Sequence, residues 1–368
     1  MFSEQATQSF LSTITLISFF VTLIVQKISS KIGNGILLDQ DFDKPQAYHK
    51  EPIPRSGGLA VFISLIFFIL IYDLLFGRFL NDYLFLSIIF FSIGFLEDIN
   101  LKTNPNIRLI LMIIALSLSI VFLSINIDNI DINFIKSWMS NRFFEVIFIL
   151  LCFLFVVNGA NLIDGFNGLL VIHLILINFI LLLININGQN TELALIITGQ
   201  IAIFFSFLLF NFPKAKIFLG DSGSYLFGSL IAINIIETNN LNPNISSVFF
   251  CILLFYLFFE VFFSFFRKLF FAKQSPLLPD NQHLHMKIYK FLLKRKYSKL
   301  KANYTTSIYI NFIYLILITP GIIFLESNLF CRYYFLILLL AYIYFYKNLK
   351  HGLRVLKCHI EGYQNKLN

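Results

Sequence analysis

The chain has 368 residues, of which 58% are hydrophobic and 13% charged, and its mean hydropathy is +0.79. This composition excludes an ordinary soluble domain. The formal net charge of +8 does not require nucleic acid, because basic loops on the cytoplasmic side of a membrane protein account for it. The four cysteines have no paired spacing, so neither a disulfide framework nor a zinc site is implied.

Long apolar runs predict an all-α polytopic membrane protein. A bilayer core of about 30 Å needs about 20 apolar residues per helix, and its backbone groups must be satisfied within the segment. About eleven spans are expected, at 9–26, 58–76, 83–97, 107–125, 143–160, 168–186, 193–211, 222–238, 246–266, 306–325 and 330–346. The third is short and is expected to tilt or extend, and the first is expected to be retained rather than cleaved.

Lys and Arg predict the orientation, with the N-terminus outside and the C-terminus in the cytoplasm. Of the 28 basic residues, the ones left outside are Arg78, Lys136, Arg142 and Arg332. Residues 1–368 are expected to form a single membrane-embedded domain in a bacterial inner membrane. Two further cytoplasmic segments are the loop 267–305 and the tail 347–368. The outer loop 126–142 is polar and carries no recognisable chemistry.

Acidic residues are costly in lipid, so those at span ends are informative. Glu97 and Asp98 end the third span, Asp164 ends the fifth and Asp221 begins the eighth. Carboxylates at one membrane level can bind Mg²⁺, a hard cation that takes a few carboxylates plus phosphate oxygens. The alternative is that each acid caps a helix or solvates a loop.

The residues around these acids favour a phosphate site over simple caps. Asn158, Asn161 and Asp164 recur every three residues, which places them on one side of a helix. Glycines flank the acids and permit tight turns and close backbone approach to a phosphate. They are Gly165, Gly168, Gly220 and Gly223.

Two other cytoplasmic segments carry candidate ligands. In Pro54–Gly58, Arg55 can bind a phosphate through two parallel hydrogen bonds. The alternative is that Arg55 is only a basic residue that flanks a membrane helix. In the loop 267–305, His283 and His285 form a His-x-His motif. Its imidazoles can donate to a phosphate or a sugar hydroxyl, and zinc is the alternative, although no further Cys or His lies nearby.

Together these segments resemble the polyprenyl-phosphate N-acetylhexosamine-1-phosphate transferases of glycosyltransferase family 4, which include phospho-N-acetylmuramoyl-pentapeptide transferase. The family's Pro-Arg-x-Gly-Gly resembles Pro54–Gly58, and its Asp-Asp helix end resembles Glu97-Asp98. Its Asn-x-x-Asp-Gly-x-x-Gly-Leu is similar to Asn161–Leu169, and its Gly-Asp-x-Gly-Ser to Gly220–Ser224. The motifs keep the family's order over most of the chain.

The resemblance implies transfer of an N-acetylhexosamine-1-phosphate, by default GlcNAc-1-phosphate, from a UDP-sugar to polyprenyl phosphate, with release of UMP. Such a step starts a cell-surface glycan such as O-antigen, teichoic acid or capsule. The implied cofactor is Mg²⁺, with Mn²⁺ as a substitute. The implied partners are the polyprenyl phosphate lipid, the UDP-N-acetylhexosamine and the membrane, and a homodimer is allowed.

The resemblance also implies residue roles. Glu97, Asp98 and Asp164 would be catalytic, with Glu97 the candidate general base, while Asp221 and Asp164 would bind the metal. The expected substrate-binding residues are Asn158, Asn161, Asn167, Arg55, Arg108, His283 and His285. Within this set the arginines would hold the lipid phosphate or diphosphate, and the histidines would contact the donor.

Several positions depart from the family's pattern. Glu97 replaces the usual first Asp, and Asn167 stands where many members have a second Asp. The His-x-His loop lacks the family's Arg and last His, which argues against the muramoyl-pentapeptide branch. Glu260, in the ninth span, is given a supporting role. The rival functions are a flippase for lipid-linked sugars and an inactive homologue.

Overall fold

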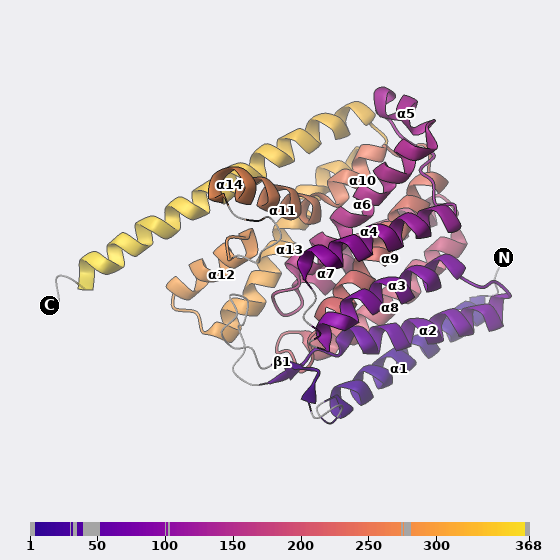
Figure 1. Ribbon diagram of the computed structural model, residues 1–368, viewed down its shortest axis with the longest axis horizontal. Helices are drawn as coiled ribbons and strands as arrows, with labels where there is room; N and C mark the ends of the chain where they lie inside the picture. The colour runs from indigo at the N-terminus through magenta and orange to yellow at the C-terminus, as the bar shows by residue number, and fades with distance from the viewer. Residues whose placement is uncertain are drawn as a thin grey trace.

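The computed structural model describes residues 4–29, 31, 35–39, 52–99, 101, 104–273, 275 and 281–364, without the side chains of 271, 272 and 350–364. Parts of the loop 267–305 and of the tail 347–368 therefore lie outside the described residues. The elements (Figure 1) are α1 Glu4–Ile28, β1 Leu38–Asp39, β2 Ile53–Pro54, α2 Gly57–Phe76, α3 Asn81–Asp98, α4 Pro105–Phe122, α5 Asn133–Met139, α6 Arg142–Ile163, α7 Leu169–Asn187, α8 Thr191–Asn211, α9 Gly220–Leu241, α10 Ser247–Leu253, α11 Phe255–Phe266, η2 Arg267–Ala272, α12 Leu284–Lys294, α13 Lys299–Ile323 and α14 Asn328–Gln364.

The structure confirms an all-α architecture built on membrane-length helices. Among the described residues, eight helices are long and apolar enough to span a membrane, or nine if one bent pair counts as a span. The expected count of eleven is not confirmed. The difference is α3 and α9, which are helical where spans were expected but do not meet the length and composition criteria for a span. The orientation across the membrane stays a prediction.

The ninth expected span, 246–266, is not one helix. It consists of two helices, α10 and α11, which meet at a bend of 73°. The two halves have different main partners. Helix α10 packs mainly against α14 and α13, whereas α11 packs mainly against α6 and makes a smaller contact with α14. At the break, the buried Tyr314 hydroxyl donates to the Leu253 carbonyl at 2.7 Å. Hydropathy alone could not reveal this break, since neither proline nor glycine marks it.

Other elements were not expected from hydropathy. A short helix, α5, lies in the loop 126–142, the amphipathic α12 lies in the loop 267–305, and β1 pairs antiparallel with β2. The loop 126–142 is also tied to the start of α10, where the Asp131 carboxylate accepts from the Ser247 amide at 2.7 Å. The last helix, α14, continues for 37 residues, well beyond the expected end at 346.

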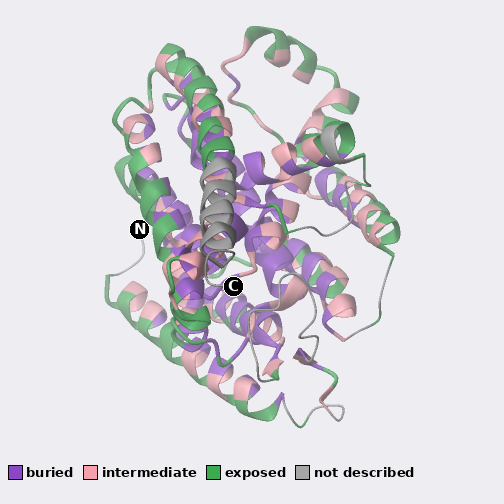
Figure 2. Ribbon diagram, turned by 90° about the vertical axis from the view of Figure 1, so that its left-hand side faces the viewer, coloured by how far each residue is buried: buried purple, intermediate pink, exposed green. Residues whose placement is uncertain are grey.

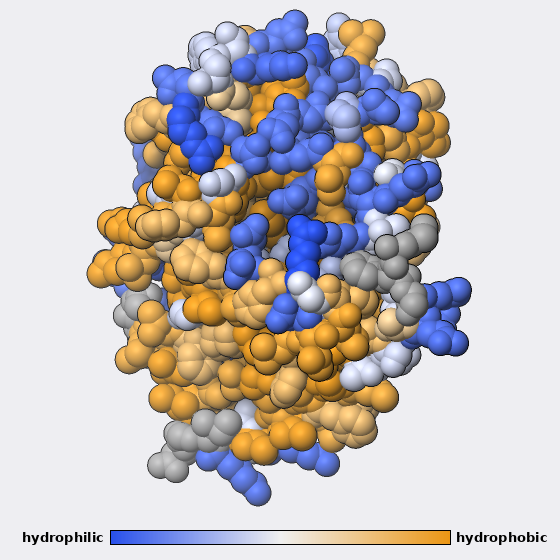
Figure 3. Space-filling model, turned by 90° about the vertical axis from the view of Figure 1, so that its right-hand side faces the viewer, coloured by the Kyte–Doolittle hydropathy of each residue, from blue (hydrophilic) through white to orange (hydrophobic). Residues whose placement is uncertain are grey.

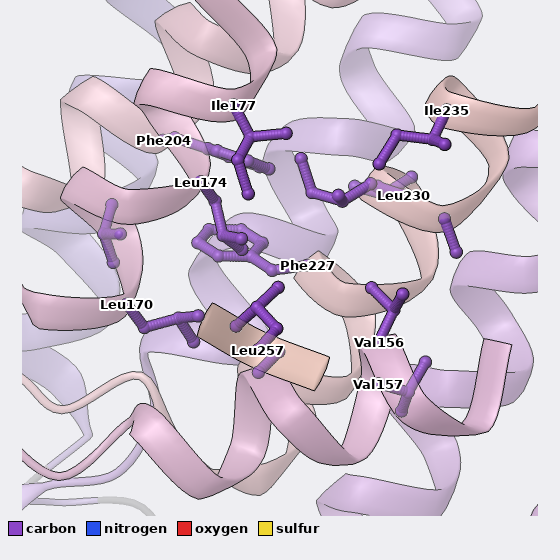
Figure 4. Packing of buried hydrophobic residues seen from close by; sticks show 14 of the residues in the cluster. Val156, Val157, Leu170, Leu174, Ile177, Phe204, Phe227, Leu230, Ile235 and Leu257 are labelled. Atoms are coloured by element: carbon purple, nitrogen blue, oxygen red, sulfur yellow. The ribbon is translucent and has the colours of Figure 1, made fainter. Parts of the chain in front are cut away.

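Helix α9 lies at the centre of the bundle and packs against α2, α3, α6 and α7. Buried residues fill the interior, and exposed residues line the outer faces of the helices (Figure 2). Side chains from α6, α7, α8, α9 and α11 point toward one another around Phe227 (Figure 4), whose ring centroid lies 3.8 Å from that of Phe204. Seen from the end that carries the N-terminus, hydrophilic side chains gather in the upper half, and apolar ones cover the lower half (Figure 3).

Polar residues inside the bundle pair with each other. Asn234 of α9 donates to Gln200 of α8 at 2.7 Å and to Asn178 of α7 at 3.0 Å. Its carbonyl oxygen accepts from the Tyr83 hydroxyl of α3 at 2.9 Å. A polar group in hydrocarbon is costly unless it is satisfied, so this cluster lets the less apolar α9 occupy the centre of the bundle.

The contact between α3 and α9 predicts a severe effect for Gly94→Ala. A Cβ at Gly94 would lie 2.4 Å from both the Asp221 carbonyl oxygen and the Ser222 amide nitrogen, so the two helices must separate. We expect a loss of at least about 2 kcal/mol in unfolding free energy, measured by thermal unfolding in detergent. Gly77→Ala is the control, because no atom lies within 4 Å of its Cβ and its φ of +66° costs about 1 kcal/mol. Equal losses in the two variants would contradict this account of the packing.

Candidate active site

The start of α9 is held by the first turn of α2. The Phe218 amide donates to the Pro54 carbonyl at 2.8 Å, and the Gly57 amide donates to the Phe218 carbonyl at 2.9 Å. The Gly58 amide donates to the Leu219 carbonyl at 2.7 Å. The Pro-Arg-x-Gly-Gly and Gly-Asp-x-Gly-Ser segments, far apart in sequence, are therefore joined backbone to backbone.

Glycine is required at this junction for close packing. A Cβ on Gly58 would lie 2.4 Å from the Gly223 amide nitrogen, and a Cβ on Gly220 would lie 2.6 Å from both Asp98 carboxylate oxygens. Gly220 also has a φ of +78°, a conformation that favours glycine. Two of the glycines expected to approach a phosphate, Gly220 and Gly223, thus serve contacts within the protein.

Asp98 binds the amino end of α9. Its carboxylate accepts from the Asp221 amide at 2.9 Å, from the Ser222 amide at 3.0 Å and from the Ser222 hydroxyl. The side chain is 2% exposed. A carboxylate on unpaired amides at a helix start is a cap, here supplied by another helix, and it opposes the positive end of the helix dipole.

Asp221, on the first turn of α9, faces outward beside Arg108 of α4. The Asp221 side chain is 32% exposed, and its Oδ2 lies 3.5 Å from Arg108 Nη1. The same guanidinium nitrogen lies 3.8 Å from Glu97 Oε1 at the end of α3. Asn161 of α6 donates to Asp221 Oδ1 at 2.9 Å and to the Ser224 hydroxyl at 3.0 Å. We call Glu97, Asp98, Asp164 and Asp221 the acid cluster.

Asp164 follows the last turn of α6 and is half-buried. Among the described residues, its carboxylate has no hydrogen-bond or ion-pair partner. Burial and the carboxylates of Asp221 and Asp98 raise the pKa of Asp164 to about 8. A cation bound beside it would favour the ionised form, so this carboxyl fits a metal or another positive charge.

Arg55 lies near the same cluster but has its own carboxylate partner. Its Nη2 and Nε donate to Asp39 Oδ2 at 2.7 and 3.0 Å. Burial by itself would lower the pKa of the Arg55 guanidinium. The carboxylates of Asp39, Asp221 and Asp98 together raise this pKa by more than burial lowers it, so the net shift is upward. The expected contact of Arg55 with a substrate phosphate remains a prediction.

The other two predicted asparagines make contacts within the protein. Asn158 donates to the Leu154 carbonyl of its own helix at 2.8 Å. Asn167 is buried, donates through its side chain to the Pro213 carbonyl at 2.9 Å and through its amide to Asn303 Oδ1 at 2.8 Å. Asn167 therefore ties the loop after Asp164 to the α8–α9 connection and to α13. A substrate contact for these two side chains remains a prediction.

His283 and His285 are buried and held by helix residues. His283 Nδ1 lies 3.0 Å from Glu260 Oε2, and His285 Nδ1 lies 3.2 Å from the Tyr256 hydroxyl. The two imidazoles stack at 5.4 Å between centroids. The His285 ring also packs edge-on against Phe166 at 5.6 Å, which places the His-x-His segment beside the loop that follows Asp164.

Within the described part of the chain, no group of three or more His, Cys, Asp or Glu side chains is arranged to hold a metal ion. The zinc alternative for the His-x-His motif therefore gains no support. The donor set of the acid cluster is compatible with a cation that uses one or two carboxylates and takes its other ligands from water and phosphate, as Mg²⁺ does.

Sequence reasoning missed three residues that shape this site. Ser222 lies inside the Gly-Asp-Ser-Gly-Ser segment and donates to Asp98. Its position in the first turn of a helix that follows a glycine is the signal that could have identified it. Asp39 carries no local signal, because its partner Arg55 is 16 residues away. Phe166 sits in a recognised motif, but as an apolar residue it was not considered.

Comparison with known proteins gives a family and named relatives. A family model described as glycosyl transferase family 4 matches residues 81–239, which contain the whole acid cluster. An undecaprenyl-phosphate alpha-N-acetylglucosaminyl 1-phosphate transferase of Thermotoga maritima is 28% identical over 73% of this chain and 78% of its own length. A probable enzyme of the same type from Bacillus subtilis is 27% identical over 76% of each chain. A phospho-N-acetylmuramoyl-pentapeptide-transferase of Dictyoglomus turgidum is 30% identical over 59% of this chain and 71% of its own length.

The capping role of Asp98 predicts that Asp98→Asn destabilises the protein. One carboxylate oxygen would become an amide donor facing the donors of α9, so we expect a loss of about 3 kcal/mol in unfolding free energy. Ser222→Ala removes one donor and leaves two amides in place, so its loss should be about 1 kcal/mol. Thermal unfolding of both variants, with Asp82→Asn at the opposite end of α3 as control, measures the difference. A stable Asp98→Asn protein would show that Asp98 does not hold α9.

Proposed function

The chain belongs to glycosyl transferase family 4, and from this membership we propose that it transfers an N-acetylhexosamine-1-phosphate from a UDP-sugar to polyprenyl phosphate. GlcNAc-1-phosphate is the proposed group, because two of the relatives are named for that transfer. The observation that carries the proposal is the convergence of Asp221, Glu97 and Arg108 from three helices, close to the Asp164 carboxylate, which has no hydrogen-bond or ion-pair partner among the described residues.

The proposed reaction is a displacement at phosphorus. A phosphate oxygen of the lipid attacks the β-phosphorus of the UDP-sugar, a new P–O bond forms, and the bond to UMP breaks. All reacting groups are anionic, so the protein must mainly position them and offset their charge. Arg108, which lies beside Glu97 and Asp221, is proposed to hold the lipid phosphate, and Asn161 orients Asp221 through its 2.9 Å hydrogen bond.

We propose Asp221 and Asp164 as the carboxylate ligands of Mg²⁺, with Mn²⁺ as a substitute. The oxygens of Asp98 already accept from α9, which leaves Asp98 a holding role rather than a ligand role. When bound, the cation neutralises charge on the diphosphate. Glu97 remains the candidate base, but the lipid phosphate has a second pKa of about 6, so a strong base is not required at neutral pH.

The proposed location is a bacterial inner membrane, with the site open to the cytoplasm. Asp98 ends α3, Asp164 follows α6 and Asp221 begins α9, so the acids share one end of the bundle. Under the expected orientation this is the end with most Lys and Arg. There a soluble nucleotide sugar meets a lipid acceptor and a cell-surface glycan begins.

Turnover by purified protein in detergent tests the function. With undecaprenyl phosphate, a panel of UDP-N-acetylhexosamines and Mg²⁺, we expect UMP release that requires both lipid and metal. Asp221→Asn should lower kcat at least about 100-fold by removing a metal ligand. Glu237→Gln, near the other end of α9, should keep wild-type turnover. Folded protein that releases no UMP from any donor would overturn the catalytic proposal and favour a flippase or an inactive homologue.

A second kinetic experiment separates the two substrates. Because Arg108 is proposed to hold the lipid phosphate, Arg108→Gln should raise the KM for undecaprenyl phosphate about tenfold, a change of about 1.4 kcal/mol. The KM for the UDP-sugar should change less than about twofold. Initial rates with each substrate varied in turn give both constants. A selective rise in the UDP-sugar KM would instead assign Arg108 to the donor.

A further inference from the structure

A second buried carboxylate lies outside the acid cluster, on α11. Glu260 is 1% exposed. Its Oε1 accepts from the Leu284 amide at 3.1 Å and from the Tyr342 hydroxyl at 2.9 Å, and its Oε2 accepts from His283 Nδ1 at 3.0 Å. These donors belong to the start of α12 and to α14, so one carboxylate joins three helices.

Glu260 supplies the cap that α12 lacks locally. Leu284 is the first residue of α12, and the preceding His283 makes no side-chain hydrogen bond to the helix start. Glu260 accepts from that first free amide and also binds the imidazole of the residue before it. A carboxylate at this position satisfies an unpaired amide and opposes the positive end of the helix dipole.

The helix held in this way reaches the loop of the acid cluster. On α12, the ring of His285 lies 5.6 Å and the ring of Tyr289 lies 5.2 Å from the ring of Phe166. Phe166 is buried and stands two residues after Asp164. A shift of α12 therefore moves the ring that supports the Asp164 loop.

The surroundings of α12 make its position depend on Glu260. An apolar cavity of about 80 Å³ lies between α11, α12, α13 and α14, and Tyr256, Leu284 and Tyr342 are among its lining residues. Free space next to the capped end offers α12 room to move if the cap is lost. Apolar walls do not supply replacement hydrogen bonds for the donors that Glu260 now satisfies.

We propose that Glu260 is a positioning residue, which caps α12 and thereby fixes Phe166 and the Asp164 loop for the reaction. The inference deepens the proposed function and rests on it for the chemistry of Asp164. Glu260 is too buried to touch either substrate and therefore acts through α12. The His-x-His motif, in this view, serves the site by holding α12 in place.

Hydrogen exchange measured by mass spectrometry, together with steady-state kinetics, tests the proposal. Glu260→Gln removes the charge and places an amide among the three donors, and Tyr342→Phe removes one donor and is the milder variant. We expect amide exchange in peptides covering α12 and residues 164–168 to rise about tenfold or more in Glu260→Gln and about threefold in Tyr342→Phe. The kcat should fall by similar factors, with the KM of both substrates within about twofold of wild type.

Tyr334→Phe is the matched control, because it removes from the same helix a tyrosine hydroxyl that donates to the Leu317 carbonyl of α13 and not to Glu260 or α12. It should leave exchange in α12 and kcat unchanged. The positioning role would be overturned if the Glu260 and Tyr342 variants changed the exchange rate of all peptides by the same factor. It would also be overturned if α12 exchanged faster without a fall in kcat. If wild-type protein shows no turnover, the proposed function fails, and exchange limited to α12 and 164–168 still decides whether Glu260 holds this segment.

Discussion

The Asp98 carboxylate on the first amides of α9 is the interaction on which the site depends. It brings the end of α3 against the start of α9, and both Gly94 and Gly220 are needed to let the two backbones come this close. Asp221, whose own amide is one of the donors, projects from the fixed turn toward Arg108. The buried position strengthens this bond, because no water competes for the amides.

Glu260 repeats the arrangement at the start of α12, which contacts Phe166 of the Asp164 loop. Asp98 accepts from two amides at the start of α9 and Glu260 from one amide at the start of α12, so in each case an acid of one helix holds the start of another. Helix starts are stable in a membrane protein only where their free N–H groups find acceptors. Carboxylates are strong hydrogen-bond acceptors. Acids at the ends of apolar segments can therefore cap helices, as Asp98 does, next to acids that are proposed to take part in the reaction, as Asp221 is.

Sequence reasoning located most of the long helices and the acids at their ends, because both are local signals. Apolar runs show where helices lie, and an acid in such a run is conspicuous. The 73° bend between α10 and α11 was not predicted, because neither proline nor glycine marks it in the sequence. The partners of Asp98, Arg55 and His283 were equally out of reach, since each contact joins residues distant in the chain. Which acids accept hydrogen bonds from helix amides could therefore be learned only from the three-dimensional contacts.

The amide cluster around Asn234 bears on how the protein is made. All of its partners precede α9 in the chain, on α3, α7 and α8. These three helices are synthesised before α9, so hydrogen-bond partners for Asn234 are already present when α9 is made. A helix of such modest hydropathy has little affinity for lipid alone. We therefore expect insertion of α9 to depend on contacts with helices that are already in the membrane.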